Sequence, residues 1–272
     1  MRHVDLGARN GPVLLFGGPY SNVQATRALF DLAAAQEIAT DHMICTGDVV
    51  AYCADPVATV AAIRTSGCTV VAGNCEKQLA ADADDCGCGF DAGSTCDRLS
   101  VEWYAFARAR LNLESKAWMG ALPDVVTFAH QGRRYGVIHG GVTDVARFIW
   151  SNSERDLFDH EWRVLEAQVG PVDGVIAGHC GIPFIHEAAR GPWINAGVIG
   201  MPPHDGHQQT RAALLEGGEV SFHRLSYDAA KASQEMIEAG LSRGYADGLL
   251  SGYWPSEDIL PEALRGASFA RG

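Results

Sequence analysis

The expected fold depends on residues 43–50, which read MICTGDVV. The apolar run from Met43 to Cys45 predicts a buried strand, and Thr46 and Gly47 end that strand and place Asp48 in a loop. In open α/β sheets, ligands bind beyond the carboxyl ends of the strands, which makes Asp48 a candidate site residue. Its carboxylate could equally cap the helix that follows.

Three later stretches share this pattern, because each is an apolar run that ends in Gly or His and carries a polar or metal-competent side chain at its tip. They read VAGNCE at residues 71–76, VIHGG at 137–141 and VIAGHC at 175–180. Four such tips are better explained by one shared site than by four unrelated helix caps. We therefore expect them to converge.

Length and composition limit the possible classes of protein. With 272 residues, 47% of them hydrophobic, we expect a single α/β domain with a C-terminal helical extension over residues 228–272. The net charge of -12 argues against binding to a nucleic-acid duplex, since phosphate backbones are held by clustered Lys and Arg. No apolar run is long enough for a membrane span and the N-terminus lacks a signal core, so we expect a cytoplasmic protein without membrane contact.

The chain has eight cysteines, too many for a cytoplasmic disulfide framework to explain them easily. Cys45 and Cys68 lie in apolar runs and are expected in the core. The others that we single out lie in loops rich in Gly and Asp, where metal or redox chemistry is possible. These are Cys75, Cys86, Cys88, Cys96 and Cys180. A structural zinc or iron-sulfur site is a weaker alternative for the first four, because their spacing matches no strong motif.

Periodicity predicts strands that alternate with helices in the first part of the chain and mostly strands later. The expected strands cover residues 12–16, 43–45, 69–72, 125–130, 134–138, 174–177, 183–188, 192–195, 210–216 and 219–225. The expected helices cover residues 23–35, 56–66, 101–110, 115–121 and 154–168, with further helices from about 228, 242 and 257. Residues 82–95 are expected to form a long loop.

The strand tips resemble a known family. The motifs that carry the resemblance are Gly47-Asp48, Gly73-Asn74, His139-Gly140 and Gly178-His179, in that order. They are similar to those of the calcineurin-like metallophosphoesterases, in particular a small bacterial phosphodiesterase-like branch. The resemblance implies a four-layer α-β-β-α sandwich of two mixed sheets flanked by helices. It also implies a metal cage of Asp48, Asn74, His139 and His179, whose nitrogen and oxygen ligands suit Fe, Zn or Mn.

The family pattern includes a second ion, for which this sequence lacks the usual ligands. The Asp-x-His motif after the first strand is replaced by Gly18 and Tyr20, and the second His of Gly-His-x-His is replaced by Gly181. The His that follows Asn in the family is Cys75. We therefore expect one ion, or two if other side chains supply ligands. The candidates for extra ligands are Tyr20, Cys75, Cys86, Cys88 and Cys180.

The expected activity is hydrolysis of a small phosphate mono- or diester by metal-activated water. Asp48, His139 and Cys75 are the expected catalytic residues, with the Cys75 thiol near the leaving group. Asn22 at a helix start and Arg147 are candidates for binding the substrate, although a plain N-cap and a surface arginine are the simpler interpretations. The alternative is a catalytically silent metal- or nucleotide-binding sensor or partner module on the same fold. A homo-oligomer is compatible with either function.

Overall fold

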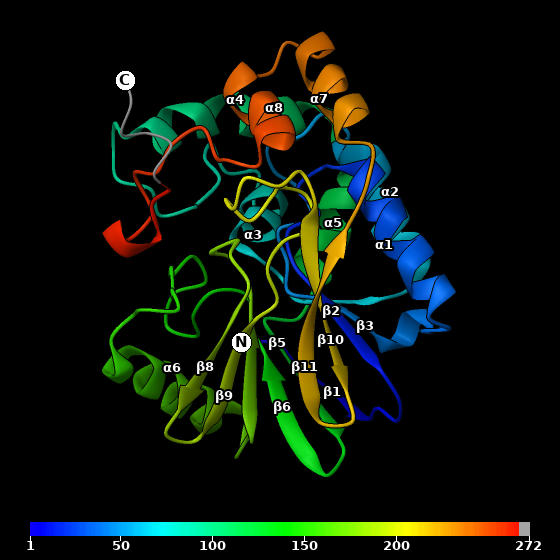
Figure 1. The fold of residues 1–272 in the computed structure, drawn as a ribbon, viewed down its shortest axis with the longest axis vertical. Helices are drawn as coiled ribbons and strands as arrows, with labels where there is room; N and C mark the ends of the chain where they lie inside the picture. The colour runs from blue at the N-terminus through cyan, green and yellow to red at the C-terminus, as the bar shows by residue number, and fades with distance from the viewer. Residues whose placement is uncertain (267–272) are drawn as a thin grey trace.

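The computed structural model of the chain describes residues 1–266, and its strands form two mixed sheets (Figure 1). The first sheet has the strand order β1 (His3–Ala8), β5 (Val125–His130), β6 (Arg133–Val137), β7 (Gly174–Ala177), β9 (Gly191–Asn195) and β8 (Phe184–Ala188). The second has the order β11 (Glu219–Leu225), β10 (Thr210–Glu216), β2 (Val13–Phe16), β3 (Met43–Cys45) and β4 (Thr69–Val70). The neighbours β2, β3 and β4 are parallel, as their alternation with helices predicts.

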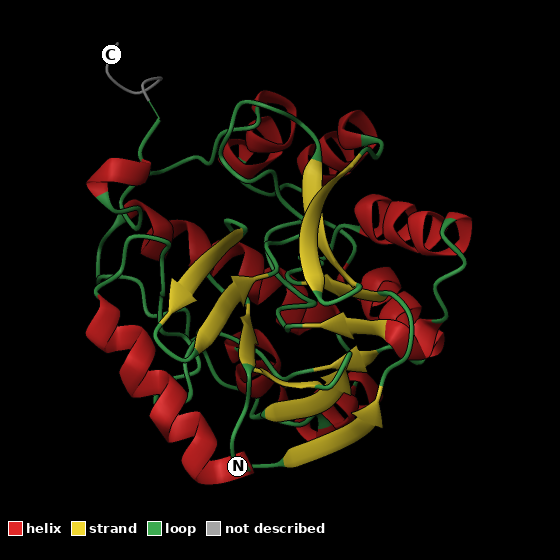
Figure 2. Cartoon of the chain, turned by 60° about the horizontal axis from the view of Figure 1, so that its bottom comes forward, coloured by secondary structure: helices red, strands yellow, loops and turns green. Residues whose placement is uncertain are grey.

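The helices enclose the strands from both sides (Figure 2). They are α1 (Val23–Ala35), α2 (Pro56–Ser66), α3 (Asn74–Ala80), α4 (Thr95–Arg110), α5 (Leu113–Ala121), α6 (Arg155–Val169), α7 (Ala229–Glu238) and α8 (Arg243–Ser251), with the short 3-10 helices η1 (Thr40–His42) and η2 (Glu262–Leu264). The α6 helix lies beside β8 and β9, whereas α1 and α2 lie on the opposite side of the strands. Within residues 1–266, none of the helices has the length and apolar character that a membrane span requires.

The structure has three hydrophobic cores, and successive side chains of a strand point alternately into two of them. In β2, Val13 and Leu15 enter the core between the two sheets, whereas Leu14 and Phe16 pack toward the helices on the outer face. In β7, Ile176 faces the other sheet and its neighbours pack toward α6. A core between the sheets and one on each outer face require four layers, so the predicted α-β-β-α sandwich is confirmed.

In the first half of the chain, β1, α3 and α4 differ from the expectation. The sequence pattern does not predict the β1 strand, because most of its side chains are exposed and it carries no apolar pattern. It does not predict the α3 helix either, which begins directly at Asn74 and so places this candidate ligand in its first turn. The α4 helix begins six residues earlier than predicted, at Thr95 instead of Val101, because the Ser94 side chain accepts the Asp97 N–H at 3.1 Å and caps a polar first turn.

The segment that follows β11 covers one end of both outer layers. Met236 of α7 and Leu249 of α8 pack into the core on the helical side of the second sheet, and Leu260 packs into the core beneath α6. The prediction of a helix from about Glu257 is wrong, since the described residues there form only η2. Residues 267–272 of the expected extension lie outside the described residues.

Candidate metal centre

The four predicted strand tips meet where the carboxyl ends of the two sheets approach each other. Asp48 follows β3 and Asn74 follows β4 in the second sheet, while His139 follows β6 and His179 follows β7 in the first. The sheets come so close that a Cβ atom added at Gly178 would lie 2.2 Å from Oγ1 of Thr46. Only glycine fits there, and residues from both sheets therefore contribute to one site.

Four candidate ligand atoms converge in this site. His139 Nε2 lies 3.2 Å from Oδ2 of Asp48, 3.1 Å from Oδ1 of Asn74 and 3.0 Å from Nδ1 of His179. The ligand atoms of Asp48, His139 and His179 all lie within 4.8 Å of one another, and the three residues are buried. The structure thus brings together the four residues that the sequence singles out as a metal cage.

The hydrogen bonds around this group fit a bound cation. His139 Nδ1 donates to the backbone oxygen of Thr46 at 2.6 Å, which leaves the lone pair of the neutral ring on Nε2. The Asn74 amide donates through Nδ2 to the backbone oxygen of Cys86 at 2.9 Å, so its Oδ1 faces inward. A proton on Nε2 of His139 can satisfy only one of the neighbouring acceptors. A cation satisfies all of them, and the donor set suits Fe, Zn or Mn.

Glu76 holds the two loops that carry Asp48 and Asn74. It is fully buried, and its Oε2 accepts the N–H groups of Asp48 at 2.8 Å and of Gly73 at 2.9 Å, while Oε1 accepts the Val49 N–H at 2.8 Å. Glu76 is the last residue of the stretch VAGNCE, but the sequence does not predict its role. The signal in the sequence that could have indicated this role is an acidic residue two positions after a candidate ligand.

The backbone of the site is strained at two candidate ligands. Asp48 has φ +56° and His179 has φ +62°, a left-handed conformation that residues other than glycine rarely adopt. Gly47, with φ +103°, leaves no room for a side chain, since an added Cβ would lie 2.7 Å from the Gly73 nitrogen and 2.8 Å from Nδ1 of His139. Strain of this kind is typical of sites whose side chains must converge.

Burial and mutual charge shift the ionisation of the site. Burial tends to raise the pKa of Asp48, but His139 and His179 outweigh it and hold that pKa well below its usual range. Burial tends to lower the pKa of His139, and the Asp48 carboxylate reverses this and raises it. Burial and the charge of His139 lower the pKa of His179. Burial and the neighbouring Asp48 raise the pKa of Glu76 to about 7.

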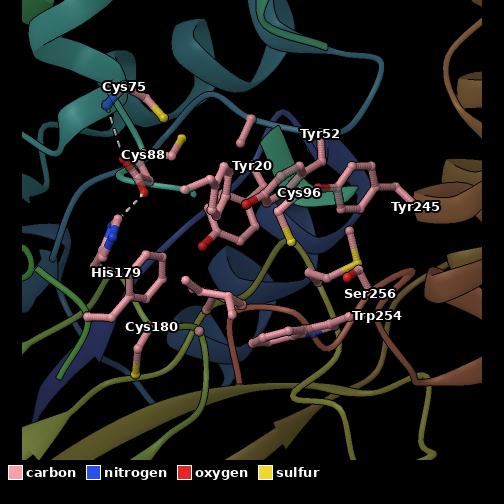
Figure 3. Close-up of a pocket in the computed structure, with 18 of the residues that line it drawn as sticks. Tyr20, Tyr52, Cys75, Cys88, Cys96, His179, Cys180, Tyr245, Trp254 and Ser256 are labelled. Carbon is pink, nitrogen blue, oxygen red and sulfur yellow. Dashed lines mark hydrogen bonds and ion pairs between the residues drawn. The ribbon is translucent and has the colours of Figure 1, made fainter. Parts of the chain in front are cut away.

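The cysteines that are candidates for extra ligands are not all free thiols. Cys86 and Cys88 are joined in a disulfide, which corrects the expectation that both are free loop thiols able to bind metal. The same bond removes two thiolates from the alternative four-cysteine metal site. The sulfur of Cys180 points away from His179 in Figure 3 and contacts the backbone oxygen of Ile182 at 3.6 Å. The thiol of Cys75 is free and buried beside Asn74.

The side chains of the two candidate substrate residues are engaged with other parts of the fold. Asn22 uses its side chain structurally, because Oδ1 accepts the Ala25 N–H at 3.0 Å to cap α1 and Nδ2 donates to the Gly200 oxygen at 3.0 Å. The guanidinium of Arg147 pairs with the buried Glu161 at 3.2 Å. The structure gives both side chains partners within the fold and does not direct them to the ion site.

A pocket opens directly beside Asp48 and His179 (Figure 3). Tyr20 lines it, which places the ring of this candidate extra ligand next to the site. Burial and the nearby Asp48 keep the pKa of Tyr20 well above its usual value, so its hydroxyl stays protonated. His204 is buried and packs against Trp254, one of the residues that line the pocket.

Comparison with known proteins agrees with this fold. The model of the calcineurin-like phosphoesterase superfamily domain matches residues 21–217. A hypothetical protein from Pyrococcus horikoshii OT3 has a similar structure, with a TM-score of 0.72 and 16% identity over 90% of this chain and 100% of its own. A metallophosphoesterase from Sphaerobacter thermophilus has a TM-score of 0.67 and 19% identity over 90% of this chain and 100% of its own. None of the curated proteins matches the sequence. Because the family model covers most of the chain, this protein belongs to the calcineurin-like phosphoesterase superfamily.

Proposed function

We propose that the protein is a phosphoesterase that hydrolyses a phosphate mono- or diester with one metal ion held by Asp48, Asn74, His139 and His179. The convergence of their four ligand atoms around His139 Nε2 is the observation that carries this proposal. Fe, Zn and Mn are the candidate ions, because mixed carboxylate, amide and imidazole ligands suit them. Family membership supports phosphoester hydrolysis as the reaction class.

A divalent ion bound there would polarise a phosphoryl oxygen and lower the pKa of a coordinated water to about 7. The chain supplies the positioning. The Cys75 N–H donates to Oδ1 of Asp48 at 3.3 Å, which leaves Oδ2 facing the histidines. The Nδ1–H bond to Thr46 fixes the orientation of the His139 ring. Both ligands are thus oriented by hydrogen bonds with the surrounding backbone, as is usual for metal sites.

We place Cys75 at the side of the leaving group. Its side chain lines the pocket and follows Asn74 in the chain. Changing Cys75 to Ser keeps a protic group at this position, and changing it to Ala removes that group. A decrease in kcat for Cys75→Ala with partial recovery for Cys75→Ser supports contact with the leaving group. Unchanged kinetics in both variants would make the thiol a bystander.

The test of the proposed activity combines metal analysis with kinetics. The purified protein is loaded with Mn, Fe, Ni or Zn and assayed with p-nitrophenyl phosphate as monoester and bis-p-nitrophenyl phosphate as diester. We expect one bound ion per chain and turnover of at least one ester. His179→Ala should lose both the ion and the activity, whereas His207→Ala, at an exposed loop histidine, should keep both. Full metal content in His179→Ala would refute the cage.

A catalytically silent metal- or nucleotide-binding module is the second candidate. It is favoured by Gly18, Tyr20 and Gly181, which stand where the family pattern has ligands of a further ion. One firmly bound ion, with no turnover of either ester under any of the four metals, would favour this module over an enzyme.

A further inference from the structure

Aromatic rings occupy the half of the site where the family pattern has ligands for a second ion. A Cβ added at Gly18 would lie 2.6 Å from Cζ of Tyr20, because the tyrosine ring folds back over this glycine. A Cβ added at Gly181 would lie 3.1 Å from Cζ2 of Trp254. Because glycine has no side chain, each of these two positions leaves space that an aromatic ring occupies. One of these rings comes from the segment after α8, far away in the sequence.

Trp254 is held in place by its polar atoms. Its backbone N–H donates to Nδ1 of His204 at 2.9 Å, and its indole N–H donates to the Pro202 oxygen at 2.7 Å. His204 in turn donates through Nε2 to Glu257 at 2.7 Å. Since the polar edge of the indole is already satisfied, the ring presents apolar surface to the pocket (Figure 3).

Other aromatic rings complete the wall in a fixed arrangement. The Tyr52 ring packs against Tyr20 with centroids 4.8 Å apart and against Tyr245 with centroids 4.4 Å apart. The Phe148 ring packs against His179 with centroids 4.3 Å apart, so the aromatic wall reaches the candidate ligands. Rings packed in this way offer faces and edges to another planar group.

The charges of the residues that line the pocket limit which ligands it can bind. Among the described residues that line it, none is lysine or arginine, and Asp48 is its carboxylate. Arg147, which follows His139 in the chain, is paired with Glu161. A phosphoryl group can be neutralised at the ion site, but further anionic groups in the pocket would lose hydration without gaining a positive partner.

We propose that this pocket binds the alcohol part of the phosphate ester, and that this part is an uncharged aromatic group. The proposal rests on the function proposed above. The phosphoryl group lies at Asp48, His139 and His179, and the aromatic group lies among Tyr20, Trp254 and their neighbouring rings. Polyphosphates and esters of negatively charged alcohols are poor substrates, because the pocket offers their additional negative charge no cation.

The first test uses the full-length protein loaded with Mn²⁺ and three monoesters of alcohols of similar acidity: benzyl phosphate, ethyl phosphate and 4-carboxybenzyl phosphate. We expect kcat/KM for benzyl phosphate to exceed that for ethyl phosphate by at least about tenfold, since burial of a phenyl ring is worth more than burial of a methyl group. The carboxylate should abolish this advantage. Equal kcat/KM for the three esters would overturn the proposal.

A binding measurement separates this proposal from the proposed activity. Benzylphosphonate and ethylphosphonate are not hydrolysed, and calorimetry gives their Kd for the Mn²⁺-loaded protein. Benzylphosphonate should bind at least about tenfold more tightly. If it does so and no ester is hydrolysed, the pocket is assigned correctly and the activity is wrong. If esters are hydrolysed but the two phosphonates bind equally, the aromatic pocket is wrong and the activity stands.

Variants of Trp254 test the wall itself. Trp254→Ala should reduce the preference for benzyl over ethyl ligands, because KM and Kd for the benzyl ligands rise toward those of the ethyl ligands, and Trp254→Phe should retain part of the preference. Trp118→Ala is the control, because Trp118 of α5 is a partly buried aromatic residue outside the pocket. Thermal unfolding identifies a variant that fails to fold. If Trp254→Ala fails to fold, the preference of the native protein for benzyl over ethyl ligands decides whether the proposal holds.

Discussion

The carboxylate of Glu76 accepts the backbone N–H of Asp48 at 2.8 Å, although the two residues are 28 positions apart. The same side chain accepts the Gly73 N–H at 2.9 Å, and so it joins the loops after β3 and β4. Because it acts on the candidate ligands through the backbone of these loops, Glu76 is a positioning residue. Its contribution can be measured separately from that of the ligands.

Changing Glu76 to Gln replaces one acceptor oxygen by an NH₂ group that faces backbone N–H donors. We expect Mn²⁺ affinity to fall by about 10- to 100-fold, the usual effect of losing a partner of metal ligands. The free energy of unfolding should fall by about 1–3 kcal/mol, because buried donors lose their acceptor. Calorimetric titration and denaturant unfolding measure the two quantities. Glu102→Gln on the exposed face of α4 is the control, and equal Mn²⁺ affinity in both variants would contradict the assignment.

Metal removal should destabilise the native protein, because an ion that binds only the folded state adds to its stability. At a free Mn²⁺ concentration 100 times the Kd, the expected gain is about 2.7 kcal/mol, and a chelator should remove it. Asp48→Asn replaces the carboxylate of the cage with a neutral amide, and its unfolding temperature should no longer respond to Mn²⁺ or chelator. Differential scanning calorimetry with and without the ion makes the comparison. An unchanged response in Asp48→Asn would place the ion elsewhere.

Gly47 and Gly67 form a matched pair for testing how closely the site is packed. Both have positive φ, +103° and +74°, but an added Cβ meets the site at Gly47 and nothing within 4 Å at Gly67. Gly67→Ala should cost about 1–2 kcal/mol of stability through backbone strain alone. Gly47→Ala should cost clearly more and should also weaken Mn²⁺ binding, since the Cβ displaces His139. If denaturant unfolding gives equal losses, steric crowding at Gly47 is not important.

Asp55 should make stability depend on pH. Partial burial and the neighbouring Glu235 raise its pKa to about 6, while Arg27 acts in the opposite direction. An unfolded Asp has a pKa near 3.9, so the folded state holds this proton more tightly. The resulting stabilisation is fully present below about pH 4 and is lost as the pH rises through about 6.

Asp55→Asn removes this titration. The stability of the variant relative to the native protein should therefore increase by about 1 kcal/mol between pH 4 and pH 7.5, a value reduced for the solvent exposure of the carboxyl group. Urea unfolding of both proteins at the two pH values gives the difference. A difference that does not change with pH would show that the pKa of Asp55 is not raised in the folded state.

The sequence alone determined the strand tips and most of the layers. The apolar run at residues 13–16 predicts a strand with two buried faces, because side chains on a strand point to opposite sides with a period of two. The glycines beside Asp48 and His179 indicate the close approach of backbone that the site requires. These features are local, and a local pattern is visible in one stretch of chain.

Only the tertiary structure decided what surrounds the ion site. The β1 strand is held by pairing with β5, more than a hundred residues away, and has no apolar pattern of its own. Trp254 reaches Gly181 because the loops that carry the two residues meet, although neither loop has a periodic pattern. Such contacts depend on how the whole chain packs, so the aromatic pocket could not be predicted from the residues that form it.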